Sequence, residues 1–139
     1  MTTIPIEPAS AGWRRTGSVL TTLAGILLIG SGFAKLAGVP PVVQPLYGYG
    51  FTHTVPLVGT LEMLSGILLL VPKTRSFGLV FASAFLGGAL ATHVQHHEAV
   101  QCFPALLVLA LVWGGVTLRH PITLWSFRSM SRPNERLAR

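Results

Sequence analysis

The sequence predicts an all-α membrane protein, a four-transmembrane-helix bundle with both termini cytoplasmic. Hydrophobic residues make up 50% of the 139 residues and charged residues only 10%, whereas a soluble domain usually carries about 25% charged residues. Four apolar stretches each approach the roughly 20 residues that cross ~30 Å of hydrocarbon. Most basic residues lie before the first stretch, between the second and third stretches, or after the fourth. Together these observations predict a single domain embedded in a lipid bilayer.

Four expected spans account for most of the chain. They are Thr16–Leu36, Val55–Val71, Phe77–Val94 and Phe103–Leu118. The expected organisation is an N-terminal cytoplasmic tail at residues 1–15, a transmembrane bundle at residues 16–118 and a basic tail at residues 119–139. In the last of these, Trp125 and other apolar side chains adjoin arginines, which predicts that the tail lies along the cytoplasmic membrane interface. An unstructured tail is the alternative.

Proline, glycine and capping residues indicate where the helices end. Gly38 to Pro41 end the first span, because proline lacks an amide hydrogen and disfavours helix in the residue before it. Thr54 and Ser76 are expected to cap the second and third helices. Pro104 is expected in the first turn of the fourth helix.

The basic residues also set the expected orientation. Nine of the ten Lys and Arg residues lie before the first span, between the second and third spans, or after the fourth, and only Lys35 does not. By the positive-inside rule those segments are cytoplasmic, and the other two connections face outward. The net charge of +6 is therefore a topology signal, and no nucleic-acid binding is expected. The outward connection at residues 38–54 carries Tyr47, Tyr49 and Phe51, so it either packs over the bundle mouth as a lid or lies in the interface.

Glu62 lies inside an apolar span, where a carboxylate is costly and needs a partner. Gly59, Glu62 and Gly66 stand at i, i+3 and i+7, so the carboxylate lies on a small-residue stripe that a neighbouring helix can approach closely. The four-carbon stem of Lys35 can reach inward from the outer end of the first span. A Lys35–Glu62 ion pair is therefore expected, either as part of a ligand site or only as a contact between helices.

The third span carries comparable small-residue stripes, which predict tight packing against its neighbours. The stripes consist of Ala84, Gly88 and Thr92, and of Gly87 and Ala91.

Three histidines follow near the outer end of the third span. His93 is the deepest, and an imidazole can exchange protons with a ligand near neutral pH. His93, His96 and His97 have the spacing of one helix face, and two histidines so spaced can bind a metal ion. A complete site would need ligands from other segments, so solvated histidines at a helix end are the simpler interpretation, and no metal site is expected. Lys35, Glu62, Thr92 and His93 remain the candidates for ligand binding or proton exchange.

Several short motifs in this order resemble the DoxX-like family of small four-span membrane proteins. They are Gly32-Phe33-Ala34-Lys35-Leu36, Gly59-Thr60-Leu61-Glu62, Gly88-Ala89-Leu90-Ala91-Thr92-His93 and Arg119-His120-Pro121. The resemblance covers about residues 16–121. It implies a four-helix bundle in a bacterial plasma (inner) membrane, in a family whose members include subunits associated with thiosulfate:quinone oxidoreduction and other membrane redox complexes.

Two classes of function are therefore open. In the first, the protein is a membrane subunit of an oxidoreductase complex that binds a quinone in the outer half of the bundle, with Glu62 and His93 at a carbonyl or hydroxyl group. In the second, it is noncatalytic, and it binds a lipid or hydrophobic small molecule or scaffolds a larger complex, as a monomer or oligomer. The sequence has no paired cysteines, haem-attachment motif or dinucleotide-binding loop. Electrons would have to be carried by a partner or by the bound quinone.

Overall fold

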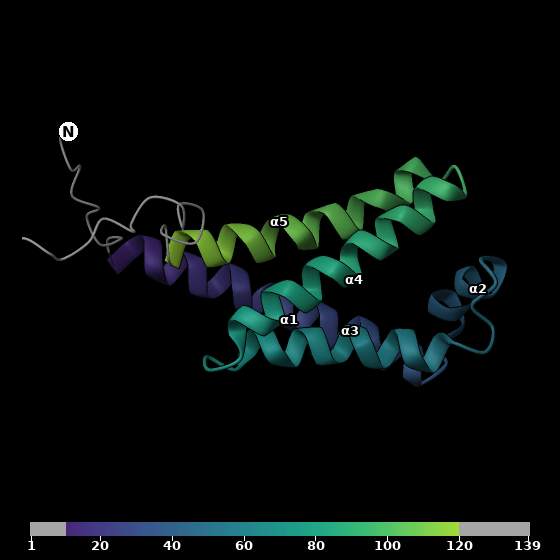
Figure 1. Ribbon diagram of the computed structural model, residues 1–139, viewed down its shortest axis with the longest axis horizontal. Helices are drawn as coiled ribbons and strands as arrows, with labels where there is room; N and C mark the ends of the chain where they lie inside the picture. The colour runs from purple at the N-terminus through teal and green to yellow at the C-terminus, as the bar shows by residue number, and fades with distance from the viewer. Residues whose placement is uncertain (1–10, 120–139) are drawn as a thin grey trace, which may run out of the picture.

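A computed structural model describes residues 11–119, which are helical apart from short connections (Figure 1). The elements are α1 (Ala11–Leu36), α2 (Pro40–Gly48), α3 (Val55–Leu70), α4 (Arg75–Gln95), the 3-10 helix η1 (Ala99–Gln101) and α5 (Cys102–Arg119). The expected all-α membrane bundle is confirmed. The C-terminal tail, which was expected to lie at the membrane interface, follows Arg119 and is outside the described residues.

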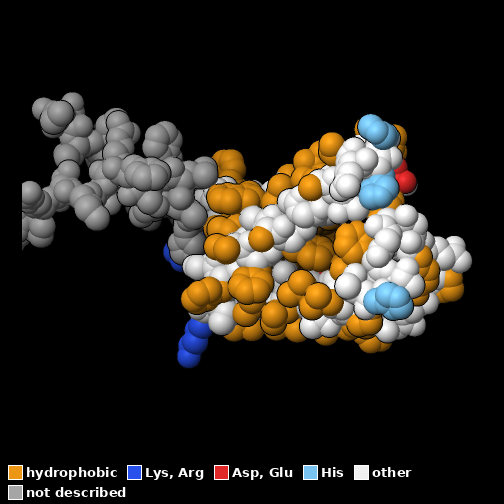
Figure 2. Space-filling view, turned by 45° about the vertical axis from the view of Figure 1, so that its right-hand side comes forward, with side chains coloured by type: hydrophobic (Ala, Val, Ile, Leu, Met, Phe, Trp, Pro, Cys, Tyr) orange, Lys and Arg blue, Asp and Glu red, His pale blue; other side chains and the backbone are white. Residues whose placement is uncertain are grey.

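Three of the helical segments are long and apolar enough to cross a membrane. They are Ala11–Leu36, Arg75–Gln95 and Ala99–Arg119, whereas α3 is apolar but shorter, at 16 residues. The first helix begins at Ala11 and not at Thr16, so it includes Arg14 and Arg15. Large apolar side chains cover much of the outer surface (Figure 2), as expected for a surface that faces lipid.

The four longest helices, α1, α3, α4 and α5, form a closed ring. The helix α1 packs against α3 and α5, and α4 completes the ring by packing against the same two helices. Successive helices run in opposite directions. One end of the ring therefore carries Arg14, Arg15, Lys73, Arg75 and Arg119, and we call it the basic end. The other end carries His53, His93, His96 and His97, and we call it the histidine end. Figure 2 shows the cationic and histidine side chains at opposite ends of the molecule.

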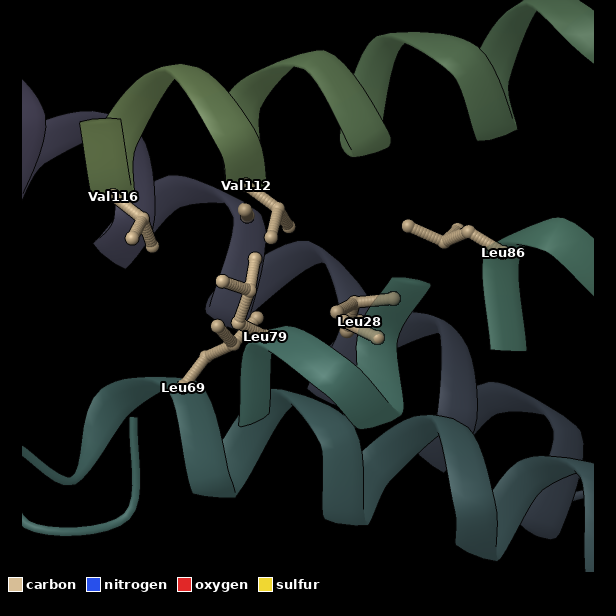
Figure 3. Close-up of a cluster of buried hydrophobic side chains, with 8 residues drawn as sticks. Leu28, Leu69, Leu79, Leu86, Val112 and Val116 are labelled. Carbon is tan, nitrogen blue, oxygen red and sulfur yellow. The ribbon is translucent and has the colours of Figure 1, made fainter. Parts of the chain in front are cut away.

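The packed core lies mainly toward the basic end. Leu28 of α1, Leu69 of α3, Leu79 of α4 and Val112 of α5 meet there (Figure 3). At this end Gly78 allows α4 to approach α3, because a Cβ at residue 78 would lie only 2.4 Å from the amide nitrogen of Leu69. Toward the histidine end, α4 and α3 diverge (Figure 1). The bundle is therefore closed at one end and splayed at the other.

Glycines explain the close contact of α1 with α3. A Cβ at residue 32 would lie 2.6 Å from the carbonyl oxygen of Gly59, and a Cβ at residue 66 would lie 2.6 Å from that of Gly25. The small-residue stripe through Gly59 and Gly66 thus packs as expected.

The expected tight packing of the stripes on α4 is wrong. A Cβ at Gly87 or Gly88 would meet no other atom within 4 Å. The physical reason is the divergence of α4 from α3, which leaves open space beside this part of the helix.

The connection after α1 contains the helix α2, which the prolines did not lead us to expect. Pro40 and Pro41 occupy its first turn, where a missing amide hydrogen costs nothing. Gly38 makes the preceding turn with a φ of 68°. Thr54 does precede α3, but its hydroxyl donates to the Phe51 carbonyl and does not cap the helix. Ser76 is not a cap, because α4 begins at Arg75 and Ser76 lies within its first turn.

Candidate functional site

Lys35 and Glu62 form an ion pair between α1 and α3. The Lys35 Nζ lies 2.5 Å from the Glu62 Oε2 and also donates to the Ser31 hydroxyl at 2.8 Å. The two charged side chains are only 12% and 8% exposed. The absence of a side chain on Gly59 makes room for the pair, since a Cβ there would lie 3.1 Å from the Lys35 Cβ. The expected contact is therefore present, and Ser31 joins it.

Two cavities adjoin this ion pair. The larger, which we call the lateral cavity, has a volume of about 670 Å³ and lies among α2, α3 and α4. The smaller, which we call the axial cavity, has a volume of about 330 Å³ and is lined by all four long helices and η1. The residues common to both linings are Phe85, Ala89, His93 and Gln101. Figure 2 shows a hollow with hydrophobic side chains in its wall on this part of the molecule.

The divergence of α4 from α3 creates the lateral cavity. Ala84, Gly88 and Thr92 line it from α4, and Val58 and Leu61 line it from α3. The stripe on α4 therefore forms a cavity wall, where the sequence led us to expect a helix contact. The cavity is bounded at the histidine end by α2, which contributes Pro41, Val42, Pro45, Leu46 and the following Tyr49. A lid in this connection was one of the two expected placements.

The chain matches the model of the DoxX-like family over residues 19–115. This chain belongs to the DoxX-like family. The matched range contains α2, α3, α4 and all the residues that line the two cavities. With its long apolar helices, this DoxX-like protein is a multi-pass integral membrane protein. Neither the curated proteins nor the solved structures contain a significant match.

In this DoxX-like protein the candidate residues meet around the two cavities. His93 lines both, Lys35 lines only the lateral cavity, and Glu62 lines only the axial cavity. Thr92 lines the lateral cavity while its hydroxyl donates to the Gly88 carbonyl within α4 at 3.0 Å. The four residues predicted from the sequence therefore border one continuous region of the bundle.

A second polar cluster holds α2 against the end of α4, and sequence reasoning missed it. The Tyr49 hydroxyl donates to the Glu98 carboxylate, and the His93 Nδ1 lies 3.5 Å from the Tyr49 hydroxyl and 3.4 Å from Glu98. The rings of Tyr49 and His96 are 4.6 Å apart. We call Tyr49, His93, His96 and Glu98 the tether cluster. The only signal in the sequence was an aromatic side chain in a connection that was expected either to act as a lid or to lie in the membrane interface.

Hydrogen bonding within the tether cluster shifts the pKa values of Tyr49 and Glu98. The bond to Glu98 raises the pKa of Tyr49 to about 12, and burial and the carboxylate charge act in the same direction. The same bond lowers the pKa of Glu98 below its ordinary value, against the opposing effect of burial, and the nearby His93 and His96 also lower it. The contact between Tyr49 and an ionised Glu98 is thus favoured across the neutral range.

The histidines do not share one helix face. The helix α4 ends at Gln95, and His97 has a φ of 59°, so the i, i+4 relation to His93 is lost. The His96 Nδ1 lies 2.9 Å from the Thr92 carbonyl oxygen. In residues 11–119 no group of three or more His, Cys, Asp or Glu side chains is arranged to hold a metal ion. Cys102 is buried at the start of α5.

Proposed function

We propose that this DoxX-like protein binds a quinone-like apolar molecule in the lateral and axial cavities, as a membrane subunit of a redox complex. The observation that carries the proposal is the position of the ion pair and His93. These polar groups border two largely apolar cavities inside one half of a membrane bundle. Ionisable residues at such depth are costly and usually serve a function.

The size and lining of the lateral cavity support a small-molecule ligand. Sites for such ligands commonly have volumes of ~300–1,000 Å³, with apolar walls and a few polar groups that fix orientation. The lateral cavity, at about 670 Å³, falls in this range. Its walls combine apolar side chains such as Val58 and Leu61 with Lys35, Thr92 and His93. An apolar tail would lie against the first group, and the polar ring would lie near His93, which also lines the axial cavity.

The direction of access follows from the splayed helices. The cavity lies between α3 and α4, and both helices expose large apolar residues to their surroundings. A ligand dissolved in the bilayer would therefore reach the cavity sideways, without crossing water. Tethered α2 bounds the same cavity from the histidine end.

The orientation and location belong to the same proposal. The basic end faces the cytoplasm, with both termini on that side, and the histidine end faces outward. The membrane is a bacterial plasma membrane, as the resemblance of the motifs to those of the family implies. Electrons reach or leave the ligand through a partner protein, because the chain's own motifs supply no redox group.

Analysis of co-purifying molecules tests the proposal. The protein would be purified in mild detergent, and its bound small molecules and proteins identified by mass spectrometry. We expect a quinone in roughly stoichiometric amounts, together with a dehydrogenase or oxidase subunit. Phospholipid as the sole bound molecule would overturn quinone binding and favour a noncatalytic lipid-binding protein.

A matched pair of variants ties the ligand to the cavity. Gly88 and Gly87 are neighbours on α4, and a Cβ at either position meets no other atom within 4 Å, but only Gly88 lines the lateral cavity. Gly88→Leu should fill part of the cavity and lower quinone occupancy severalfold. Gly87→Leu should leave occupancy unchanged. Equal occupancy in the two variants would place the quinone elsewhere.

A further inference from the structure

We propose that the axial cavity selects the reduced, hydroxyl-bearing form of its ligand, so that a hydroquinone binds more tightly than the corresponding quinone. The inference rests on the proposed function, and it concerns how the ion pair presents its two charges to the two cavities.

The ion pair divides the cavities by hydrogen-bonding character. Lys35, which is a donor only, lines the lateral cavity. Glu62, which in an ion pair is an acceptor only, lines the axial cavity. A ligand head in the axial cavity therefore meets the carboxylate and not the ammonium group.

The Glu62 carboxylate has acceptor capacity to spare. Its two oxygens offer about four lone-pair positions, and Lys35 is bonded to Oε2. The residue is only 6% exposed, so water from outside the bundle has little access to the remaining positions. A ligand hydroxyl would donate to them, and such a charge-assisted bond is about twice as strong as a neutral one. A carbonyl oxygen at the same place would be repelled.

The tautomer of His93 that donates to Glu98 through Nδ1 adds a second acceptor on the wall that the two cavities share. Its Nδ1 lies 3.4 Å from the Glu98 carboxylate. A neutral imidazole that donates to Glu98 through Nδ1 carries no hydrogen on Nε2, which is then an acceptor. Glu62 and His93 both line the axial cavity from different helices, so both favour a head that donates hydrogen bonds.

The two volumes suit the parts of one amphiphilic molecule. The axial cavity, at about 330 Å³, is roughly half the size of the lateral cavity, at about 670 Å³. A compact aromatic head fits the former, and an alkyl or isoprenoid tail fits the apolar walls of the latter. The head and tail would join beside Phe85 and Ala89, which line both cavities.

Binding measurements on the intact protein test this selection. Dissociation constants would be measured in lipid nanodiscs, without oxygen, for a decyl-substituted benzoquinone, its hydroquinone and the dimethyl ether of that hydroquinone. We expect the hydroquinone to bind roughly 10- to 100-fold more tightly than the quinone, as a hydrogen bond to a charged group implies. The ether keeps the ring and the tail but replaces both hydroxyl donors with methoxy groups, and it should bind as weakly as the quinone.

The double variant Lys35→Met, Glu62→Gln assigns the acceptor. A carboxamide both donates and accepts, so the preference should fall to within about threefold while the bundle stays free of an unpaired charge. Quinone binding equal to or tighter than hydroquinone binding in the native protein would overturn the inference and leave the proposed function standing. Failure of every probe to bind would overturn both. Hydroquinone preference retained in the double variant, or equally tight binding of the ether, would also overturn the selection by Glu62.

Discussion

Gly32 of α1 packs against Gly59 of α3, and the ion pair between these helices depends on this contact. A Cβ at residue 32 would lie 2.6 Å from the Gly59 carbonyl oxygen and 2.7 Å from the Met63 amide nitrogen. Lys35 lies one turn beyond Gly32, and Glu62 lies one turn beyond Gly59. The distance between the helix axes therefore sets whether the lysine can reach the carboxylate.

Gly32→Ala should destabilise the bundle, because both atoms in its way belong to the backbone and cannot turn aside. Overpacking of this kind costs about 1–3 kcal/mol. Gly30→Ala is the matched control, since a Cβ there meets no other atom within 4 Å and alanine favours helix over glycine. Thermal unfolding in detergent would give the melting temperatures of both variants. An unchanged melting temperature for Gly32→Ala would contradict the close contact of α1 with α3.

Removal of one partner of the ion pair should cost more than removal of both. Lys35→Met leaves the buried Glu62 without its cation, and loss of a partner from a buried pair costs about 3–5 kcal/mol. Adding Glu62→Gln to that variant should restore most of the loss. Unfolding of the two single variants and the double variant forms a double-mutant cycle. Additive losses would mean that the two groups do not interact.

The tether cluster should make the docking of α2 depend on pH. The lowered pKa of Glu98 means that docking is complete above its ordinary value of 4.5 and is lost as the pH falls through the lowered pKa. The raised pKa of Tyr49 means that docking is complete below 10.0 and is lost as the pH rises through about 12. We therefore expect α2 to stay docked from about pH 5 to about pH 10.

Spin labels would follow this docking. One label replaces Gln44 on α2 and the other replaces Val100 on η1, both exposed, in a background with Cys102→Ser. A narrow distance distribution at about pH 7 should broaden as the pH falls through the lowered pKa of Glu98. Tyr49→Phe, which removes the donor, should already broaden the distribution at about pH 7. A distribution that stays narrow in Tyr49→Phe would show that other contacts hold α2.

Cysteine labelling in intact cells tests the orientation. Single cysteines would replace Thr3, Gln44, Thr74, Ala99 and Glu135 in a protein lacking Cys102. If the basic end is cytoplasmic, a reagent that cannot cross the membrane should modify only positions 44 and 99. Modification at position 74 or 135 would reverse the assignment, and the cavities would then open toward the cytoplasmic half.

The ion pair was predictable because a buried carboxylate demands a partner, and the order of the spans left Lys35 as the cation within reach. The helix α2 was not predictable, since three prolines in nine residues suggest a loop unless their positions in the helix are known. The cavity wall on α4 was also missed. Small residues permit close packing but do not require it, and the angle of α4 depends on the contact of Gly78 with Leu69 at the opposite end. The tether cluster was also not predictable, because it joins Tyr49 to Glu98, and their contact depends on how two connections far apart in the sequence meet in space.

The shortness of α3 affects the lipid around the protein. Its 16 residues span about 24 Å, less than the ~30 Å of an average hydrocarbon core. A bilayer next to a short helix becomes thinner to avoid exposing apolar tails to water. Since α3 forms one side of the lateral cavity, lipid headgroups there would dip toward the opening. A molecule that travels with its ring at headgroup depth would then arrive level with Lys35 and His93, and membrane thickness would influence how fast it enters.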